Sequence, residues 1–126
     1  MIDHRAERSS SATAYIAKAG SNVHVLINTY VTRILPIEKD EVEFCTVEFG
    51  LDATSPKRCL SAKKEVIISA GVIQTPQILL NSGIGSKDEL QAVGIPTIVD
   101  DPSVGKNFSD QVGSLVLMET TIQDTE

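Results

Sequence analysis

Cysteine, aromatic side chains and long apolar runs are all scarce in this chain of 126 residues. The two cysteines, Cys45 and Cys59, are too few for a disulfide scaffold, and they lack the CxxC spacing of zinc or thioredoxin-like sites. No apolar run approaches the roughly 18 residues that span a bilayer, and the first residues contain no signal-peptide core. We therefore expect neither a metal centre nor a membrane partner.

Concentrated positive charge is also missing. The chain has 11 Lys and Arg against 17 Asp and Glu, a formal net charge of −6. Nucleic-acid binding by counterion release needs clustered Lys and Arg, so we expect no nucleic-acid partner. What is present, 41% hydrophobic residues with eight Gly and five Pro, is typical of one small globular domain at most.

β-branched runs predict strands at residues 23–27, 30–35 and 42–49, two or three of them antiparallel, with a turn at 50–57. If residues 43–49 and 57–63 form a hairpin, Cys45 and Cys59 face each other and can form a disulfide. The alternative is that both cysteines are small, half-buried apolar side chains without a bond. The sequence leaves both possibilities open.

The run Val-Ile-Ile-Ser-Ala-Gly at residues 66–71 has no polar alternation, which predicts a strand buried on both faces of a layered α/β sheet. Short strands are also expected at residues 98–99 and 115–118. Three helices are predicted from their capping residues: 12–19 after the serines at 9–11, 76–81 with Thr75 as N-cap, and one that a capping box of Ser86 and Glu89 opens. Gly20, Ser82-Gly83 and Gly94 end these three helices.

A strand that ends in small residues before a helix N-terminus is the geometry with which α/β proteins approach a phosphate or nucleotide. Ser69-Ala70-Gly71 followed by Thr75-Pro76 has this form. The alternative is that the small residues only let the helix pack close to the strand. No GxGxxG or GxxxxGK[ST] occurs, so no self-contained nucleotide site is encoded. His4 and His24 have no companion at catalytic or metal spacing and are expected to be surface or strand-face residues.

Four segments together, residues 8–15, 23–35, 64–85 and 102–110, resemble the glucose-methanol-choline family of FAD-dependent oxidoreductases. The stretch from Ser69 to Gly85, with its SAG, TP and SGIG elements in order, is similar to the second signature of that family. The closest similarity is to fungal aryl-alcohol oxidases.

The resemblance implies an α/β fold: part of an FAD-binding Rossmann-like domain, with an antiparallel β meander and short helices. Residues 1–126 would be a middle segment of that domain, without the N-terminal GxGxxG unit and without the C-terminal catalytic histidine. FAD is the implied cofactor. Val31 would meet the adenine ring through its backbone, and Ala70 and Gly71 would pass close to the adenosine half. No catalytic residue is expected in the chain.

The parent protein would then be a secreted fungal enzyme that transfers hydride from a small-molecule alcohol to the flavin, and the chain alone would be inactive. Two alternatives remain open. One is a truncated gene product that persists as a non-catalytic nucleotide-binding or interaction module. The other is a scaffold from a different flavoprotein family.

Overall fold

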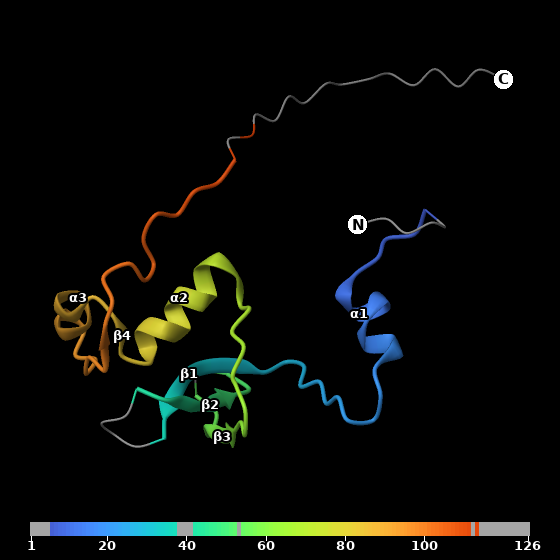
Figure 1. The fold of residues 1–126 in the computed structure, drawn as a ribbon, viewed down its shortest axis with the longest axis horizontal. Coiled ribbons are helices and arrows are strands. Elements are labelled where there is room, and N and C mark those ends of the chain that lie inside the picture. Colours follow the sequence, from blue (N-terminus) through green and yellow to red (C-terminus); the bar gives the residue numbers. More distant parts are fainter. Residues whose placement is uncertain (1–5, 38–41, 53, 112, 114–126) are drawn as a thin grey trace.

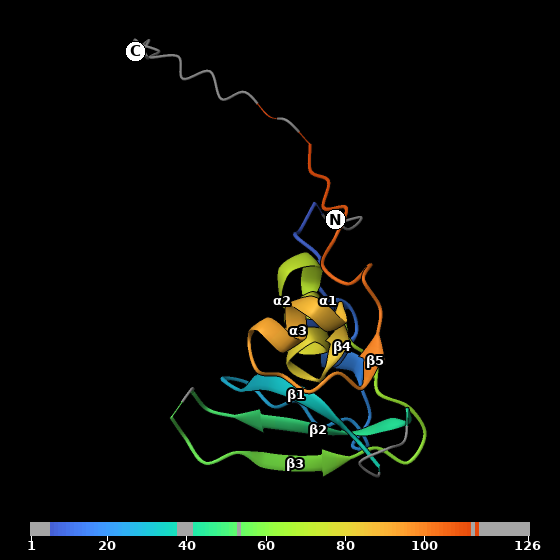
Figure 2. The ribbon, with the colours of Figure 1, turned by 90° about the vertical axis from the view of Figure 1, so that its left-hand side faces the viewer.

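The computed structural model describes residues 6–37, 42–52, 54–111 and 113. Three β-strands form one antiparallel sheet, and two helices and a small parallel strand pair lie on one side of it (Figures 1 and 2). The elements in order are α1 (Ser11–Ala14), η1 (Ile16–Lys18), β1 (Tyr30–Pro36), β2 (Phe44–Gly50), β3 (Arg58–Ser61), α2 (Gly71–Asn81), β4 (Ile84–Gly85), α3 (Lys87–Ala92) and β5 (Val99–Asp100). The predicted α/β class with an antiparallel meander is confirmed.

The three-stranded sheet has the order β1-β2-β3, so β1 and β3 are its edges. The strands predicted at 30–35 and 42–49 and the turn at 50–57 are present. Asp52 closes this turn, because its Oδ1 accepts hydrogen bonds from the backbone N–H groups of Thr54 and Ser55 and from the Thr54 hydroxyl. These bonds, the Thr54 hydroxyl first, hold the pKa of Asp52 below its usual range.

The predicted facing of Cys45 and Cys59 is wrong. The register pairs Glu48 with Cys59, and the Ala62 N–H donates to the Cys45 carbonyl. Cys45 and Glu48 are three residues apart on β2, so the two thiols project from opposite faces of the sheet. Both cysteines are free.

Helix α2 begins at Gly71, four residues before the predicted N-cap. Thr75 is therefore not the N-cap; its Oγ1 instead accepts a hydrogen bond of 3.1 Å from the Ala70 N–H. Pro76 lies inside the helix rather than at its first position. The predicted end is confirmed, since Ser82 is the C-cap and Gly83 has φ +79°, a left-handed conformation that glycine adopts without strain.

Gly83 also joins α2 to the parallel pair β4–β5. Its carbonyl accepts hydrogen bonds from the N–H groups of Ile98 and Val99. A Cβ at Gly83 would lie 2.4 Å from the Pro96 carbonyl oxygen, so only glycine fits this junction. The short strand expected at 98–99 is present as β5, whereas residues 115–118 lie outside the described residues.

Helix α3 ends at Ala92 with Val93 as its C-cap, and the predicted stop residue Gly94 follows with φ +74°, but the predicted capping box does not form. Ser86 is the N-cap without a side-chain bond. The N–H of Lys87 instead donates to Asp100 Oδ1 at the end of β5, and Glu89 forms an ion pair with Lys106. A carboxylate from a neighbouring strand has replaced the local cap.

The predicted helix over residues 12–19 is divided. Ser10 caps α1 through a reciprocal capping box with Thr13, and after Tyr15 the chain continues as the single 3₁₀ turn η1 before Gly20. Figure 1 places α1 to one side of the sheet, joined to β1 by an extended connection.

The predicted strands at 23–27 and 66–71 are wrong for the structure of this chain. Residues 23–27 and 66–70 have no ladder partners within the described part of the chain, and Gly71 belongs to α2. Ile27 and Ile67 are respectively 75% and 77% exposed. A strand needs a neighbour to satisfy its backbone groups, and β propensity alone supplies none. The buried apolar side chains are instead Ile34 on β1, Ile78 on α2 and Leu90 on α3.

Candidate functional site

A cavity of about 760 Å³ lies between β1, the β2–β3 turn and the face of α2 that carries Gln74, Gln77, Ile78 and Asn81. Val31 and Ala70, two of the three residues predicted to bind a cofactor, both line it. They come from separate segments of the sequence, and the fold brings them to one site. Thr29, Tyr30, Thr32, Asp52, Lys57, Gln74, Gln77, Ile78 and Asn81 complete the lining.

Gly71, the third predicted residue, is the first residue of α2 and follows Ala70 directly. It is not among the residues that line the cavity. Its φ of +87° favours glycine, and no described heavy atom lies within 4 Å of the place where a Cβ would stand. Glycine is needed at this position for the backbone turn and not for close packing within this chain.

Strand β1 turns its outer edge toward α2, and the cavity opens beside that edge. The Ile34 N–H donates to Ser82 Oγ at 2.8 Å, and the Asn81 amide donates to the Thr32 carbonyl at 3.3 Å. Ser82 Oγ in turn donates to the Ile78 carbonyl at 2.6 Å. Two side chains from the end of α2 therefore hold the β1 edge at Thr32 and Ile34, and Val31 directly precedes the first of these positions.

Glu48 supports the same strand from the opposite side. Its carboxylate accepts hydrogen bonds from Thr32 Oγ1 at 2.7 Å and from the Arg33 guanidinium at 3.1 and 3.0 Å. The bonds from Arg33 first, and then from Thr32, hold the pKa of Glu48 below its ordinary value, and the carboxylate raises the pKa of Arg33. The Glu48 side chain is 14% exposed, so this pair is well shielded from water on the carboxylate side.

The polar groups of the cavity wall are suited to a neutral, hydrogen-bonding ligand. The side-chain amides of Gln74, Gln77 and Asn81 can each donate and accept. Lys57 and Asp52 lie at the turn side, where Lys57 Nζ donates to the Asp52 carbonyl at 2.7 Å. A volume of this size is in the range of small-molecule and cofactor sites.

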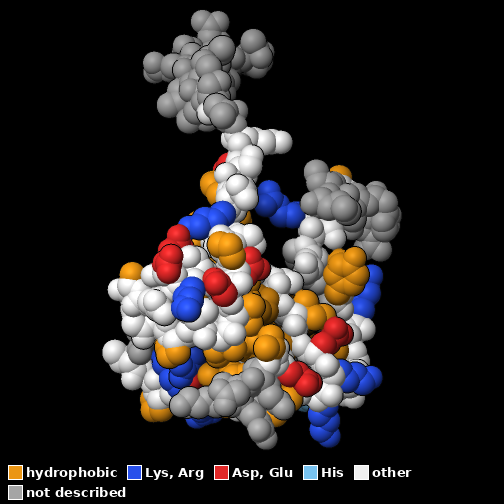
Figure 3. Space-filling model, turned by 60° about the vertical axis from the view of Figure 1, so that its left-hand side comes forward, with side chains coloured by type: hydrophobic (Ala, Val, Ile, Leu, Met, Phe, Trp, Pro, Cys, Tyr) orange, Lys and Arg blue, Asp and Glu red, His pale blue; other side chains and the backbone are white. Residues whose placement is uncertain are grey.

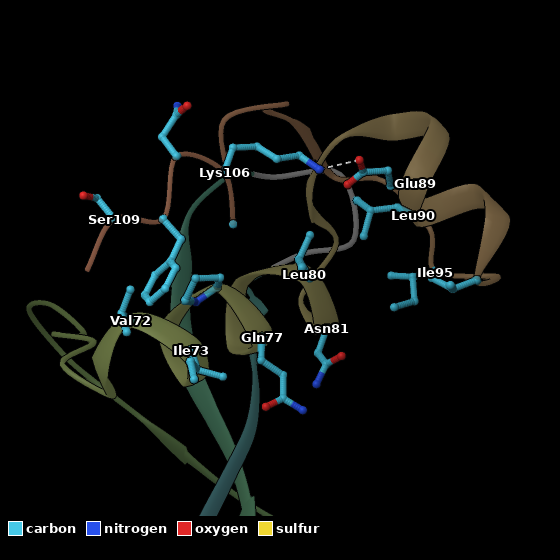
Figure 4. Close-up of a pocket in the computed structure, with 15 residues that line it drawn as sticks. Val72, Ile73, Gln77, Leu80, Asn81, Glu89, Leu90, Ile95, Lys106 and Ser109 are labelled. Carbon is cyan, nitrogen blue, oxygen red and sulfur yellow. Dashed lines mark hydrogen bonds and ion pairs between the residues drawn. The ribbon is translucent and has the colours of Figure 1, made fainter. Parts of the chain in front are cut away.

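A second cavity of about 930 Å³ runs along the other face of α2, between α3 and residues 105–109. Figure 4 shows Val72, Ile73 and Leu80 of α2 on one side of it and Leu90 and Ile95 on the other, with the Lys106–Glu89 ion pair at its rim. In Figure 3, hydrophobic side chains gather at the centre of the molecular face. The sequence reasoning missed this groove, although Val72, Pro76 and Leu80 recur at helical spacing.

Groups for acid–base or metal chemistry are sparse in the described ranges. His24 lies exposed in the connection before β1, whereas His4 lies outside the described residues. Within these ranges no three His, Cys, Asp or Glu side chains come close enough to hold a metal ion. No helix among the described residues is long and apolar enough to cross a membrane.

Over residues 2–113 the chain matches the sequence family described as GMC oxidoreductase. It is 58% identical to pyranose dehydrogenase 2 of Leucoagaricus meleagris and 60% identical to pyranose dehydrogenase of Agaricus campestris, in each case over 99% of this chain and 21% of the relative. It is 43% identical to the FAD, quinone glucose dehydrogenase of Drosophila melanogaster over 83% of this chain and 17% of that protein.

These relatives are several times longer than the chain, which spans about a fifth of their length. Their names describe sugar dehydrogenases, and the expected closeness to aryl-alcohol oxidases stays a prediction. The part of the family that matches is its N-terminal, FAD-binding domain.

Proposed function

The chain is a member of the glucose-methanol-choline family of FAD-dependent oxidoreductases, and we propose that residues 1–126 are a middle segment of the FAD-binding domain that holds the adenosine half of the cofactor. The single observation that carries this proposal is the meeting of Val31 and Ala70 at one cavity. The family resemblance assigns each of these positions to the adenosine half on its own, and their meeting at one cavity supports both assignments together.

The β1 edge supplies the binding chemistry. The backbone of an edge strand offers N–H and C=O groups that the sheet does not use, and the polar edge of adenine carries both a donor and acceptors. A main-chain contact at Val31 needs no polar side chain, which agrees with an apolar residue at this position. The small side chain of Ala70 keeps the facing wall free of bulk, so that the ring and ribose can lie between the strand and α2.

We further propose that the longer protein oxidises a CH–OH donor, either a sugar, as the names of the relatives suggest, or another alcohol. Bound FAD supplies the hydride acceptor in this chemistry. Residues of this chain bind and orient the adenosine end of the cofactor. Catalytic groups are assigned to other parts of the protein, and secretion of the protein stays a prediction.

The exposure of large apolar side chains favours a segment over an independent binding module. Ile67 and Ile73 are 77% and 75% exposed. A free-standing module would leave this apolar surface in water, where each exposed side chain forgoes about 1.5–3 kcal/mol of burial free energy. A segment of a larger domain buries it against neighbouring strands.

The test is FAD binding by the full-length protein with an obstructed cavity. Ala70→Leu adds bulk to the wall beside Val31 and is expected to raise the Kd for FAD by about tenfold or more. The matched control is Val72→Leu, which adds volume two residues further along but lines the other cavity. Wild-type affinity in the Ala70→Leu protein would contradict the proposal.

A further inference from the structure

Strand β1 contains an irregularity next to the residue assigned to adenine. Val31 pairs with Phe49 and Arg33 pairs with Glu48, so two steps on β1 match one step on β2. Thr32 is the extra residue of a β-bulge. Bulges redirect the backbone on either side of them and recur beside functional sites.

The bulge at Thr32 is held from both sides. On the sheet side, Thr32 Oγ1 donates to the Glu48 carbonyl at 3.2 Å and to Glu48 Oε1 at 2.7 Å. On the helix side, the Asn81 amide donates to the Thr32 carbonyl at 3.3 Å. The hydroxyl and the carbonyl of the inserted residue therefore each have a partner, one from β2 and one from α2.

We propose that Glu48 and Asn81 are positioning residues for the adenosine-binding edge of β1, because together they hold the bulge that orients the Val31 main chain. This inference rests on the proposed function and adds to it the residues that preorganise the site. An unheld bulge can move along the strand by one residue, and such a slip exchanges the groups that face the two sides of the strand.

Glu48 distinguishes positioning from direct contact. It does not line the cavity, whereas Val31, Thr32 and Asn81 do. Glu48 therefore acts on the ligand through its bonds to Thr32 and Arg33 or through its charge, which also acts on Lys57 of the cavity wall. Asn81 lines the cavity and by itself would not separate the two roles.

The experiment compares Glu48→Ala with wild type in the full-length protein, with FAD, ADP and FMN as separate probes. ADP carries the adenosine half of the cofactor, and FMN carries the flavin half. Loss of the hold on Thr32 is expected to raise the Kd for FAD and ADP by about three- to tenfold, the equivalent of one or two hydrogen bonds, while the Kd for FMN stays within about twofold.

Two matched variants serve as controls. Glu48→Gln keeps a carbonyl oxygen that can accept from Thr32 and is expected to restore most of the ADP affinity. Thr46 lies on β2, as Glu48 does, but away from the bulge. Thr46→Val removes its 2.8 Å hydrogen bond to Ser61 of β3 and is expected to leave the Kd for ADP unchanged. If Glu48→Ala and Thr46→Val give the same ADP affinity as wild type, the positioning role is overturned.

Should Glu48→Ala fail to fold, Glu48→Asp replaces it, because this change keeps the negative charge outside the cavity and shortens the side chain, which draws the carboxylate away from Thr32. The Kd for ADP is expected to rise by a similar factor. A Kd equal to that of wild type would overturn the proposal. The wild-type arm tests the proposed function separately. If wild-type protein binds FMN but not ADP, the adenosine site itself is wrong and this inference is lost with it.

Discussion

Two regions of this chain have similar β-branched sequences and different structures. Residues 30–36 and 44–50 form the paired strands β1 and β2, from Tyr30 opposite Gly50 to Pro36 opposite Phe44, with register shifts at Thr32 and between Leu35 and Pro36. Residues 66–70 are as rich in β-branched and small residues but remain unpaired within the described part of the chain, with Ile67 exposed. This difference shows that whether a segment forms a strand depends more on a pairing partner nearby in the same chain than on the residues of the segment itself.

The sharpest test of this comparison is amide hydrogen exchange in the full-length protein. If residues 66–70 form a buried strand against a partner elsewhere in the protein, their amides exchange about a thousandfold more slowly than the exposed amides of residues 20–22. The measurement is peptide-resolved mass spectrometry of the holoprotein. Equally fast exchange in both segments would mean that residues 66–70 stay unpaired.

Gly83→Ala is expected to cause the largest loss of stability in the paired region. The new Cβ would overlap the Pro96 carbonyl oxygen, and the residue would also have to keep a φ of +79°. The free energy of unfolding should fall by about 3 kcal/mol or more, as measured by urea denaturation.

Gly94→Ala is the matched control for this change. Gly94 has φ +74°, and no described heavy atom lies within 4 Å of the position that a Cβ would take. Only the backbone penalty of about 1 kcal/mol should therefore appear. Equal losses at the two glycines would show that the contact with Pro96 contributes nothing.

Ser82→Ala tests the hydrogen bond that connects β1 to the end of α2, and it should reduce the free energy of unfolding by less than Gly83→Ala does. It removes the acceptor of the Ile34 N–H and leaves this donor without its partner in the buried core. The expected loss is about 2 kcal/mol in the same denaturation assay. Ser61→Ala removes an exposed hydrogen bond to Thr46 and should cost less than about 1 kcal/mol. If Ser82→Ala lowers the free energy of unfolding no more than Ser61→Ala does, the hydrogen bond between Ile34 and Ser82 does not stabilise the contact of β1 with α2.

The smallest predicted effect is the dependence of stability on pH at Glu48. Because the folded-state pKa of Glu48 lies below its ordinary value of 4.5, its contribution to stability is complete above that pH. It is lost as the pH falls through the folded-state pKa. The Glu48→Gln protein should show a shallower decline of unfolding free energy below about pH 4.5, by denaturation at several pH values. Parallel curves for the two proteins would contradict the pairing with Arg33 and Thr32.

Sequence reasoning succeeded where an element and its partner or terminator lie close together. The hairpin strands at 30–36 and 44–50, the turn at Asp52 and the glycine ends at Gly83 and Gly94 all depend on residues nearby in the chain. It failed where a distant residue takes the place of a local one, since Asp100 caps α3 instead of the Ser86–Glu89 box. It also failed on the exact register of a local hairpin, since β2 and β3 pair Glu48, and not Cys45, with Cys59.

The sequence by itself determined the family, through its motifs, and the α/β class, through local periodicity. The cofactor-binding roles of Val31, Ala70 and Gly71 follow from the family resemblance and stay a prediction. Only the tertiary structure decided that Val31 and Ala70 share a cavity and that a bulge at Thr32 lies beside it. It also decided that side chains of α2 and β2 hold β1 from its two sides. Such contacts join residues up to 49 positions apart, and their geometry depends on packing and strand register, which local patterns do not encode.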